Sequence, residues 1–216
     1  MSPRTDNKIE SHERIRKTAS RMIRKEGLAA TSVHKVMEES GFTVGGFYAH
    51  FDNREHMIRE AFETAAAERR NYVQDMQAEL PPRDRAAHFV STYLTQEHVA
   101  DMEKGCMWAA LLSELPRSGQ ATRELTSNSL KGSIEYFTEN RALSPPEPIP
   151  HNNQALSPPV PSLNAREAAI ASMAIAFAGL NLARMVTDPV LRDEILLAGT
   201  KAAEILKANV AKEDKK

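Results

Sequence analysis

Hydrophobic residues recur at three- and four-residue intervals along most of the chain, which is the spacing of amphipathic helices. In residues 9–26, for example, Ile15, Ala19 and Ile23 are interspersed with basic side chains, and Gly27 is typical of the residue after a helix end. No segment of convincing length alternates between apolar and polar residues as a half-buried strand does. The pattern predicts an all-α fold with about nine helices in total.

Two short helices are expected between Ser32 and His50, with a tight turn at Gly41 between them. Ser32 and Thr43 are residue types that cap helix N-termini, and glycine tolerates the positive φ that a tight turn requires. Asn53 is the N-cap expected for the next helix. Further helices are predicted at residues 53–80, from Pro82 through Leu94 and beyond, and at 106–115, 120–141, 164–186 and 189–211.

Residues 142–162 contain seven of the twelve prolines. Because proline removes a backbone donor and breaks helices, this segment is predicted to be an exposed, partly disordered loop. The helix expected after it, at 164–186, is apolar all round and should be buried on more than one side. Two closing helices from each of two subunits would make a four-helix interface. The alternative, in which both belong to the core of one subunit, is also open.

The segment from Thr43 to His50 has a composition that a core helix would not need. Gly45 and Gly46 would each cost about 1 kcal/mol relative to alanine inside a helix. Close approach to another surface explains that cost better than internal packing does. The hydroxyl of Tyr48 and the imidazole of His50 can hydrogen-bond phosphates, so the segment has the chemistry of a recognition helix in a DNA major groove.

Charge and composition narrow the class of protein. The net charge of the whole chain, −1, does not indicate nucleic-acid binding. Residues 1–51, however, carry nine Lys and Arg against six Asp and Glu, a net charge of +3. This sign suits an N-terminal nucleic-acid module. A single cysteine, Cys106, excludes an internal disulfide framework. The polar N-terminus and the lack of a long apolar run predict no signal peptide, no membrane span and a cytoplasmic location.

No enzymatic or metal-binding motif is evident. The sequence contains no Gly-x-Ser-x-Gly, P-loop, His-Glu-x-x-His or Glu-x-x-His pattern, so we expect neither catalysis, nor a cofactor, nor a bound metal. His88 and His98 are ten residues apart on a predicted helix, which is not a metal-binding spacing, and both are expected at the surface.

Residues 14–62 resemble the N-terminal domain of the tetracycline-repressor (TetR) family of transcriptional regulators. The strongest part is Gly-Phe-Thr-x-Gly-x-Phe-Tyr-x-His-Phe-x-Asn-Arg-Glu from Gly41 to Glu55. Val36-Met37 stands where the family usually has Ile-Ala, and Arg54 where it usually has Lys. A shorter stretch, GCMWAALLSELPR at 105–117, looks like one that recurs in a single branch of the family.

The resemblance implies a helix-turn-helix DNA-binding domain at residues 1–52 and a helical ligand-binding and dimerisation domain at 53–216. The implied function is a repressor that binds a near-palindromic DNA operator as a homodimer and is released by a small, apolar inducer. The helix that begins after Asn53 would couple the two parts. The implied DNA contacts are Ser32, His34, Lys35, Thr43, Val44, Gly45, Gly46, Tyr48, His50 and Arg54.

Base reading would rest on few side chains, because the second short helix has no Arg, Asn or Gln for a bidentate base contact. The remaining candidates for base contacts are Thr43, the methyl groups of Val44, and Lys35 or His34. Adaptable and aromatic residues of the later helices are the candidates for an apolar ligand site. They are Met102, Cys106, Met107, Trp108, Leu111, Phe137, Met173 and Phe177.

Two alternatives remain open at this point. Cys106 is by default a small buried hydrophobe, but it would also suit a repressor that senses electrophiles or redox state through a thiol. In the second alternative, from another class, the chain is an all-α protein-interaction scaffold without DNA binding.

Overall fold

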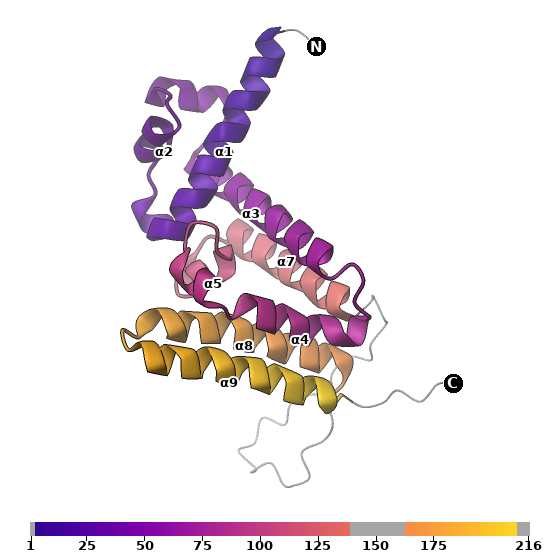
Figure 1. Cartoon of the computed structure of the whole chain (residues 1–216). Helices are drawn as coiled ribbons and strands as arrows, with labels where there is room; N and C mark the ends of the chain where they lie inside the picture. The colour runs from indigo at the N-terminus through magenta and orange to yellow at the C-terminus, as the bar shows by residue number, and fades with distance from the viewer. Residues whose placement is uncertain (1–2, 139–162, 211–216) are drawn as a thin grey trace, which may run out of the picture.

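The computed structural model describes residues 3–138 and 163–210. Within them the chain forms α-helices and two 3₁₀ helices, with one isolated β-bridge between Leu163 and Val210 and no strand. The predicted all-α fold is confirmed (Figure 1). The elements are α1 (Pro3–Ala30), α2 (Val33–Glu39), η1 (Val44–Ala49), α3 (Arg54–Met76), α4 (Pro82–Tyr93), α5 (Gln96–Ala100), α6 (Met107–Ala110), η2 (Leu115–Arg117), α7 (Gln120–Thr138), α8 (Ala165–Met185) and α9 (Pro189–Ala208).

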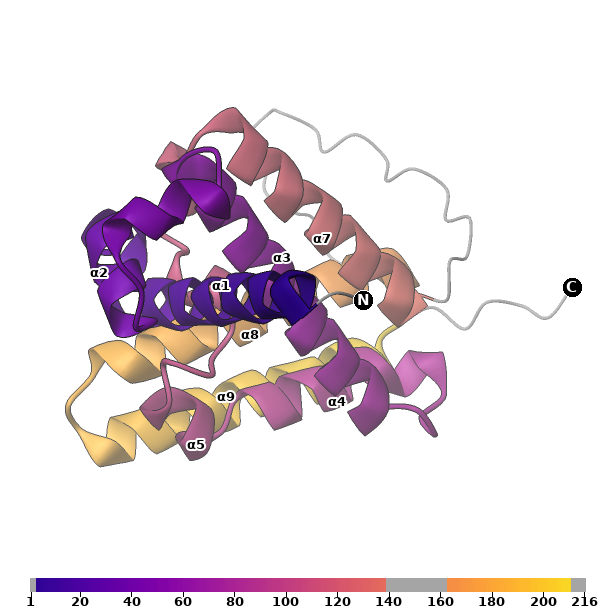
Figure 2. The same ribbon diagram turned by 90° about the horizontal axis from the view of Figure 1, so that it is seen from above.

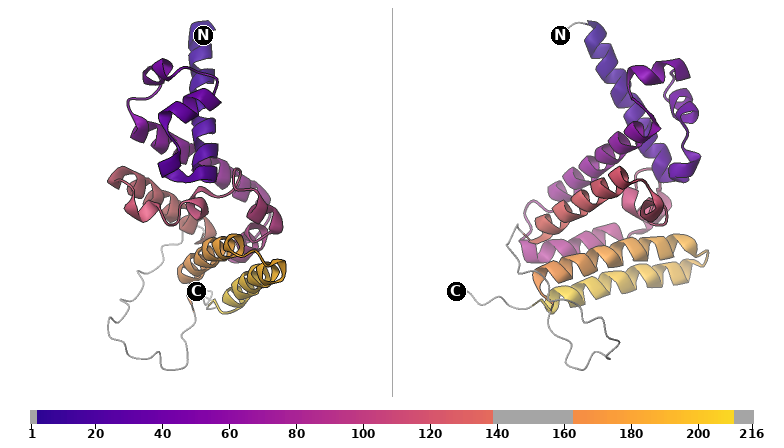
Figure 3. Two further views of the ribbon diagram at one scale, coloured as in Figure 1. Left: turned by 90° about the vertical axis from the view of Figure 1, so that its left-hand side faces the viewer. Right: turned by 180° about the vertical axis from the view of Figure 1, so that it is seen from behind.

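The helices pack around two apolar cores, one toward each end of the molecule. α1, α2 and η1 lie at one end of the molecule, with the first turns of α1 extending beyond it, and the α8–α9 pair lies at the other end (Figures 1 and 3). α8 and α9 run side by side, as the view from above also shows (Figure 2). α3 packs against α1 at its beginning and against α7 further on, so it links both ends.

The N-terminal core is the apolar cluster between α1, α2, η1 and α3, closed from below by α6 and η2. Its buried members come from distant parts of the sequence, because the cluster extends past residue 52 into α3 and includes Met107, Leu111 and Leu115. The other members are Ile15, Ala19, Met22, Ile23, Val36, Met37, Phe47, Phe51, Met57, Ile58, Ala61, Phe62 and Ala65.

The bundle core is the second apolar cluster, between α4, α7, α8 and α9. It contains several aromatic rings in contact: Phe89 lies 5.2 Å from Phe137 and 5.0 Å from Tyr93, centroid to centroid. The length and hydropathy of α8 would suffice for a membrane span, but α8 packs against α4, α7 and α9 as a core helix. Trp108 packs against both cores and therefore joins them.

Glu114 connects the last turn of α1, after its kink at Gly27, to the start of η2. Its Oε2 accepts hydrogen bonds from the backbone N–H groups of Leu28 (3.0 Å) and Ala29 (3.3 Å). The chain turns there at Gly27, which has φ +84°, and a Cβ at this position would lie 2.4 Å from Glu114 Oε1. Glycine is thus required at residue 27 both for its backbone and for the close approach of a side chain.

Several helix boundaries differ from those predicted. η1 is a 3₁₀ helix, and α3 ends at Met76, where the side chain of Gln77 turns inward and donates to Arg85 O (3.0 Å). The helix predicted at 106–115 is only the single turn of α6, followed by η2. The short helix α5 was not predicted. The proline-rich segment 142–162 lies outside the described residues.

We expect Gly27→Ala to lower the free energy of unfolding by about 2–3 kcal/mol. A left-handed conformation costs an L-residue about 1–2 kcal/mol, and displacing the Glu114 carboxylate weakens hydrogen bonds worth about 1 kcal/mol or more. Urea unfolding measures the change. Gly41→Ala is the matched control, since Gly41 also has positive φ (+75°) but only Arg14 Nη2 at 3.9 Å from its Cβ position. Equal losses in the two variants would show that the Glu114 contact contributes nothing.

Candidate nucleic-acid interface and a cavity in the bundle

α2 and η1 begin at the residues expected to cap them. The Ser32 hydroxyl accepts a hydrogen bond from the backbone N–H of Lys35 (3.2 Å), as the sequence predicted. Thr43 occupies the N-cap position of η1, but its side chain makes no capping hydrogen bond and is exposed. Gly41 has positive φ, as predicted. The Thr43 hydroxyl is therefore available to an external partner.

Two buried rings fix the orientation of η1. Phe47 and Phe51 are each 1% exposed and stack with their centroids 5.4 Å apart in the N-terminal core. Val44 and Tyr48, on the opposite side of this short helix, are 43% and 76% exposed. The burial of Phe47 and Phe51 thus leaves Val44 and Tyr48 facing the solvent.

The glycine pair has no internal packing reason. A Cβ at Gly45 would have no neighbouring atom within 4 Å, and one at Gly46 would meet Met37 Cε at 3.8 Å, an ordinary contact. Neither glycine has a positive φ. Among the described residues, no packing contact requires glycine at either position, and alanine would fit at both.

His50 lies at the edge of the same surface, half-buried against α1. Its ring is 5.7 Å from that of His12, and its Nδ1 is buried without a hydrogen-bond partner. Burial, and then the charges of His12 and Lys8, lower the pKa of His50. The imidazole is therefore neutral at pH 7 and can still donate one N–H to a phosphate.

A polar network behind η1 holds α1 to α3. Glu60 of α3 contacts His12 Nε2 through Oε2 (2.6 Å) and His56 Nε2 through Oε1 (2.8 Å). The ring of His12 in turn stacks on Phe51 (4.7 Å between centroids). One carboxylate thus positions two histidines around the ring that anchors η1.

The remaining predicted DNA contacts divide into two groups. His34 and Lys35 are exposed on α2, within 3.6 Å of Glu38 and 3.3 Å of Glu26 respectively. Arg54, in contrast, donates to backbone carbonyls of the α1–α2 connection, from Nε to Thr31 O (3.2 Å) and from Nη2 to Thr31 O (3.1 Å) and Leu28 O. Its guanidinium is used within the domain, where the sequence analysis expected a phosphate contact.

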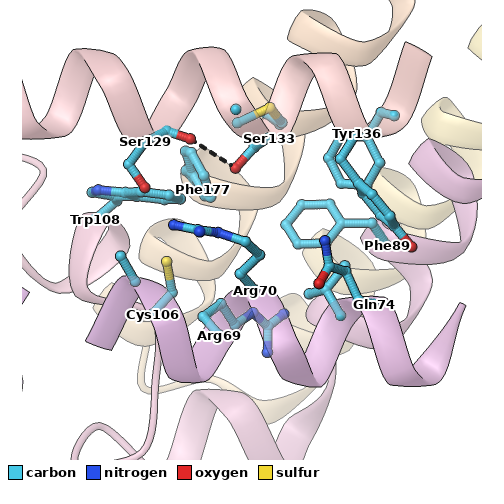
Figure 4. Close-up of a pocket in the computed structure, with 15 residues that line it drawn as sticks. Arg69, Arg70, Gln74, Phe89, Cys106, Trp108, Ser129, Ser133, Tyr136 and Phe177 are labelled. Atoms are coloured by element: carbon cyan, nitrogen blue, oxygen red, sulfur yellow. Dashed lines mark hydrogen bonds between the residues drawn. The ribbon is translucent and has the colours of Figure 1, made fainter. Parts of the chain in front are cut away.

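A cavity lies between α3, α7 and the bundle core (Figure 4). The volume of the cavity is about 40 Å³, and the space around it is open to solvent. Of the predicted ligand-site residues it brings together Cys106, Trp108, Phe137, Met173 and Phe177. The lining that the sequence analysis missed is Ala66, Arg69, Arg70, Val73, Gln74, Phe89, Ser129, Gly132, Ser133 and Tyr136.

Three predicted ligand-site residues do not line this cavity. Met102 is 40% exposed in the turn before α6, while Met107 and Leu111 are buried in the N-terminal core. The reason is the shortness of α6: within one turn, its successive side chains point into different cores. The missed residues are mostly polar positions of α3 and α7, which in sequence look like solvent-facing positions of amphipathic helices.

His98 is not at the surface as predicted, but supports the backbone at Cys106. Its Nε2 accepts from the Cys106 N–H (3.2 Å), so Nδ1 carries the proton and donates to Tyr93 O (2.9 Å). Arg184 donates to His98 O (2.7 Å). Cys106 itself is 4% exposed. The imidazole thus fixes the start of α6 through hydrogen bonds that only the neutral form can make.

Burial lowers the pKa of His98 to about 4 from an ordinary value of 6.5, although the Tyr93 carbonyl opposes the shift. Above pH 6.5 the group is neutral in both states; between pH 6.5 and 4 only the unfolded state binds the proton. We therefore expect His98 to lower the free energy of unfolding by about 1.4 kcal/mol for each unit by which the pH falls from 6.5 to 4. Urea unfolding from pH 7.5 to 4 would measure the slope. His98→Gln should flatten it, and an unchanged slope would contradict this role.

The comparisons with known proteins agree with this geometry. Residues 15–61 match the model of "Bacterial regulatory proteins, tetR family". An uncharacterised HTH-type transcriptional regulator of Bacillus subtilis, YerO, is 33% identical over 78 residues, which are 35% of this chain and only 27% of that protein. The chain thus matches about a quarter of the length of this curated relative.

Solved structures extend the likeness to the whole fold. A TetR-family regulator from Cytophaga hutchinsonii superposes with a TM-score of 0.70 at 17% identity, over 100% of this chain and 99% of that one. FadR from Bacillus subtilis, in complex with stearoyl-CoA, gives a TM-score of 0.60 at 15% identity, over 92% and 99% of the two chains. Residues 15–61 are thus similar to bacterial regulatory proteins of the tetR family, and the chain shares its fold with the solved regulators.

Proposed function

We propose that the chain is a cytoplasmic transcriptional regulator that binds a near-palindromic operator as a homodimer and releases it when a small molecule enters the bundle. The observation that carries the proposal is η1, where Val44 and Tyr48 are exposed beside two glycines without internal packing constraints. Such a surface fits the major groove closely, and the hydroxyl and imidazole groups at its edges suit phosphates.

Ser32, His34, Lys35, Thr43, Val44, Gly45, Gly46, Tyr48 and His50 are the proposed contacts. Of these, Lys35 contributes the one permanent positive charge, so recognition depends on shape, register and dimer spacing more than on bidentate base contacts. Arg54 acts indirectly. Its hydrogen bonds to the carbonyls of Leu28 and Thr31 hold these residues to the start of α3 and so help to orient α2.

The proposed dimer interface is the outer surface of α8 and α9. On α8, Ile170, Ala174, Ala178 and Leu182 are exposed and follow one another at four-residue spacing. On α9, Val190, Leu197 and Ile205 are 64%, 54% and 60% exposed. Apolar surfaces on two adjacent helices suit a four-helix contact between two copies, as the sequence analysis expected.

The proposed ligand site is the cavity between α3 and α7. Its lining includes α3, which also contributes to the N-terminal core, and Trp108, which packs against both cores. A ligand that repositions these elements would change the separation of the two reading heads in a dimer. FadR, which shares the fold, holds an acyl-CoA ligand, and that likeness supports ligand binding without identifying the ligand here.

The alternative of a Cys106 sensor has narrower support. The thiol lines the cavity but is buried, so only a reagent that enters the cavity would reach it. The alternative of a scaffold without DNA binding has no feature that explains the glycine pair or the family match at residues 15–61.

The direct test selects duplexes bound by the full chain from a random DNA pool. We expect a near-palindromic site whose affinity falls steeply with salt concentration. Tyr48→Phe should weaken binding to that site by roughly tenfold or more, since a hydrogen bond to a charged group such as a phosphate is worth about 1.5 kcal/mol or more. Fluorescence anisotropy at fixed salt measures the change. The unfolding midpoint should not move, because Tyr48 is 76% exposed. Selection of no duplex would contradict the proposed function.

Gly45→Ala separates folding from recognition. Alanine should raise the free energy of unfolding by up to about 1 kcal/mol, because the Cβ meets no neighbour and restricts the unfolded chain. Operator affinity should nevertheless fall, since the new methyl group lies where the groove is approached. Gly132→Ala on α7, whose Cβ also has open space, is the matched control and should gain stability without losing operator affinity. Equal operator affinity in both variants would remove the argument from close approach.

A further inference from the structure

The cavity contains an arginine whose hydrogen-bonding groups are not satisfied by the protein. Arg69, on α3, lines the cavity, and its Nε and Nη2 are buried without a hydrogen-bond partner. Among the described residues it is the only arginine with two such nitrogens. Two buried N–H groups without acceptors are costly on a cation, because the guanidinium stays protonated at any physiological pH and cannot escape its charge by titration.

Aromatic rings compensate this charge only in part. The Arg69 Cζ lies 5.0 Å from the ring centroid of Tyr93, 5.2 Å from that of Tyr72 and 5.7 Å from that of Phe89. Ring faces attract a cation, but they offer no lone pairs to N–H groups in the plane of the guanidinium. The electrostatic cost is therefore reduced while the donors remain unsatisfied.

The two unsatisfied nitrogens define the shape of the missing acceptor. Nε and Nη2 share one edge of the guanidinium plane, from which two parallel N–H bonds project. A carboxylate accepts both with its two oxygens, and this bidentate geometry is the arrangement that distinguishes arginine from lysine. A neutral carbonyl or hydroxyl would satisfy one donor well and leave the charge unpaired.

The rest of the lining indicates what the carboxylate would be attached to. Phe89, Trp108, Phe137, Met173 and Phe177 supply an apolar wall, and no carboxylate side chain is among the lining residues. The other polar groups include Gln74 and a second arginine, Arg70, both on α3, and the hydroxyls of Ser129 and Ser133 on α7 (Figure 4). Unlike those of Arg69, the nitrogens of Arg70 are not among the buried atoms that lack a partner. The site is thus apolar with a positive anchor at one wall.

We propose that the cavity binds carboxylic acids with an apolar body, and that Arg69 holds the carboxylate through Nε and Nη2. This proposal rests on the proposed function for its regulatory meaning, and sharpens the expected apolar inducer into an amphipathic acid. The anchor stands on α3, the helix that begins at Arg54 directly after η1. A ligand paired with Arg69 therefore acts on the element that supports the reading head.

Isothermal titration with matched probe pairs tests the proposal. Octanoate and naphthalene-1-carboxylate are compared with octanamide and naphthalene-1-carboxamide, which have nearly the same shape without the charge. We expect at least one acid to bind roughly tenfold or more tightly than its amide, because charge-assisted hydrogen bonds exceed neutral ones by this order. In Arg69→Met the preference should disappear while the amide binds as before, and in Arg69→Lys it should be partly retained.

Arg83→Met, which removes an exposed arginine outside the cavity, is the control and should keep the full preference. Unfolding midpoints verify that the Arg69→Met protein is folded; its stability without ligand should be equal to or above that of the parent. Equal affinity for acid and amide, no binding of either acid at millimolar concentration, or a preference that survives in Arg69→Met would each overturn the proposal. Operator binding is measured separately on the unsubstituted chain, so that failure of the proposed function and failure of this site are distinguishable.

Discussion

Two buried phenyl rings hold the recognition segment in place. A six-residue 3₁₀ helix makes too few hydrogen bonds to be stable on its own, so η1 depends on the burial of Phe47 and Phe51 in the N-terminal core. The same burial decides which side chains face outward. The histidine network around Glu60 and the contacts of Arg54 with the α1–α2 connection then fix the surroundings of these rings.

The structure uses charged side chains in two different ways. Arg54 and Glu114 are satisfied by backbone groups and tie loops to helices, so their contribution is structural. Arg69 has no such partner and lies against aromatic rings instead. In the sequence, all three residues look like ordinary charged positions of amphipathic helices. Only the three-dimensional packing distinguishes their roles.

Local patterns in the sequence predicted the N-terminal part well. The caps at Ser32 and Asn53 and the turn at Gly41 each follow from residues close together in the chain. The cavity was predicted only in part, because its wall combines α3, α4, α7 and α8. The sequence indicated Phe137 and Phe177 as candidates for an apolar site. It did not indicate that the polar residues Arg69 and Ser133 face the cavity. The role of His98 was likewise invisible, since its partners are the backbone of Tyr93 and Cys106.

The origin of the N-terminal core has a consequence for how the chain folds. Part of the wall behind η1 comes from Met107, Leu111 and Leu115, which follow η1 by more than fifty residues, and Trp108 belongs to both cores. During synthesis the reading head emerges first but cannot complete its interior until the segment around α6 has been made. We therefore expect the two ends of the molecule to form one cooperative unit, in which loosening the bundle near α6 also loosens the core beneath η1.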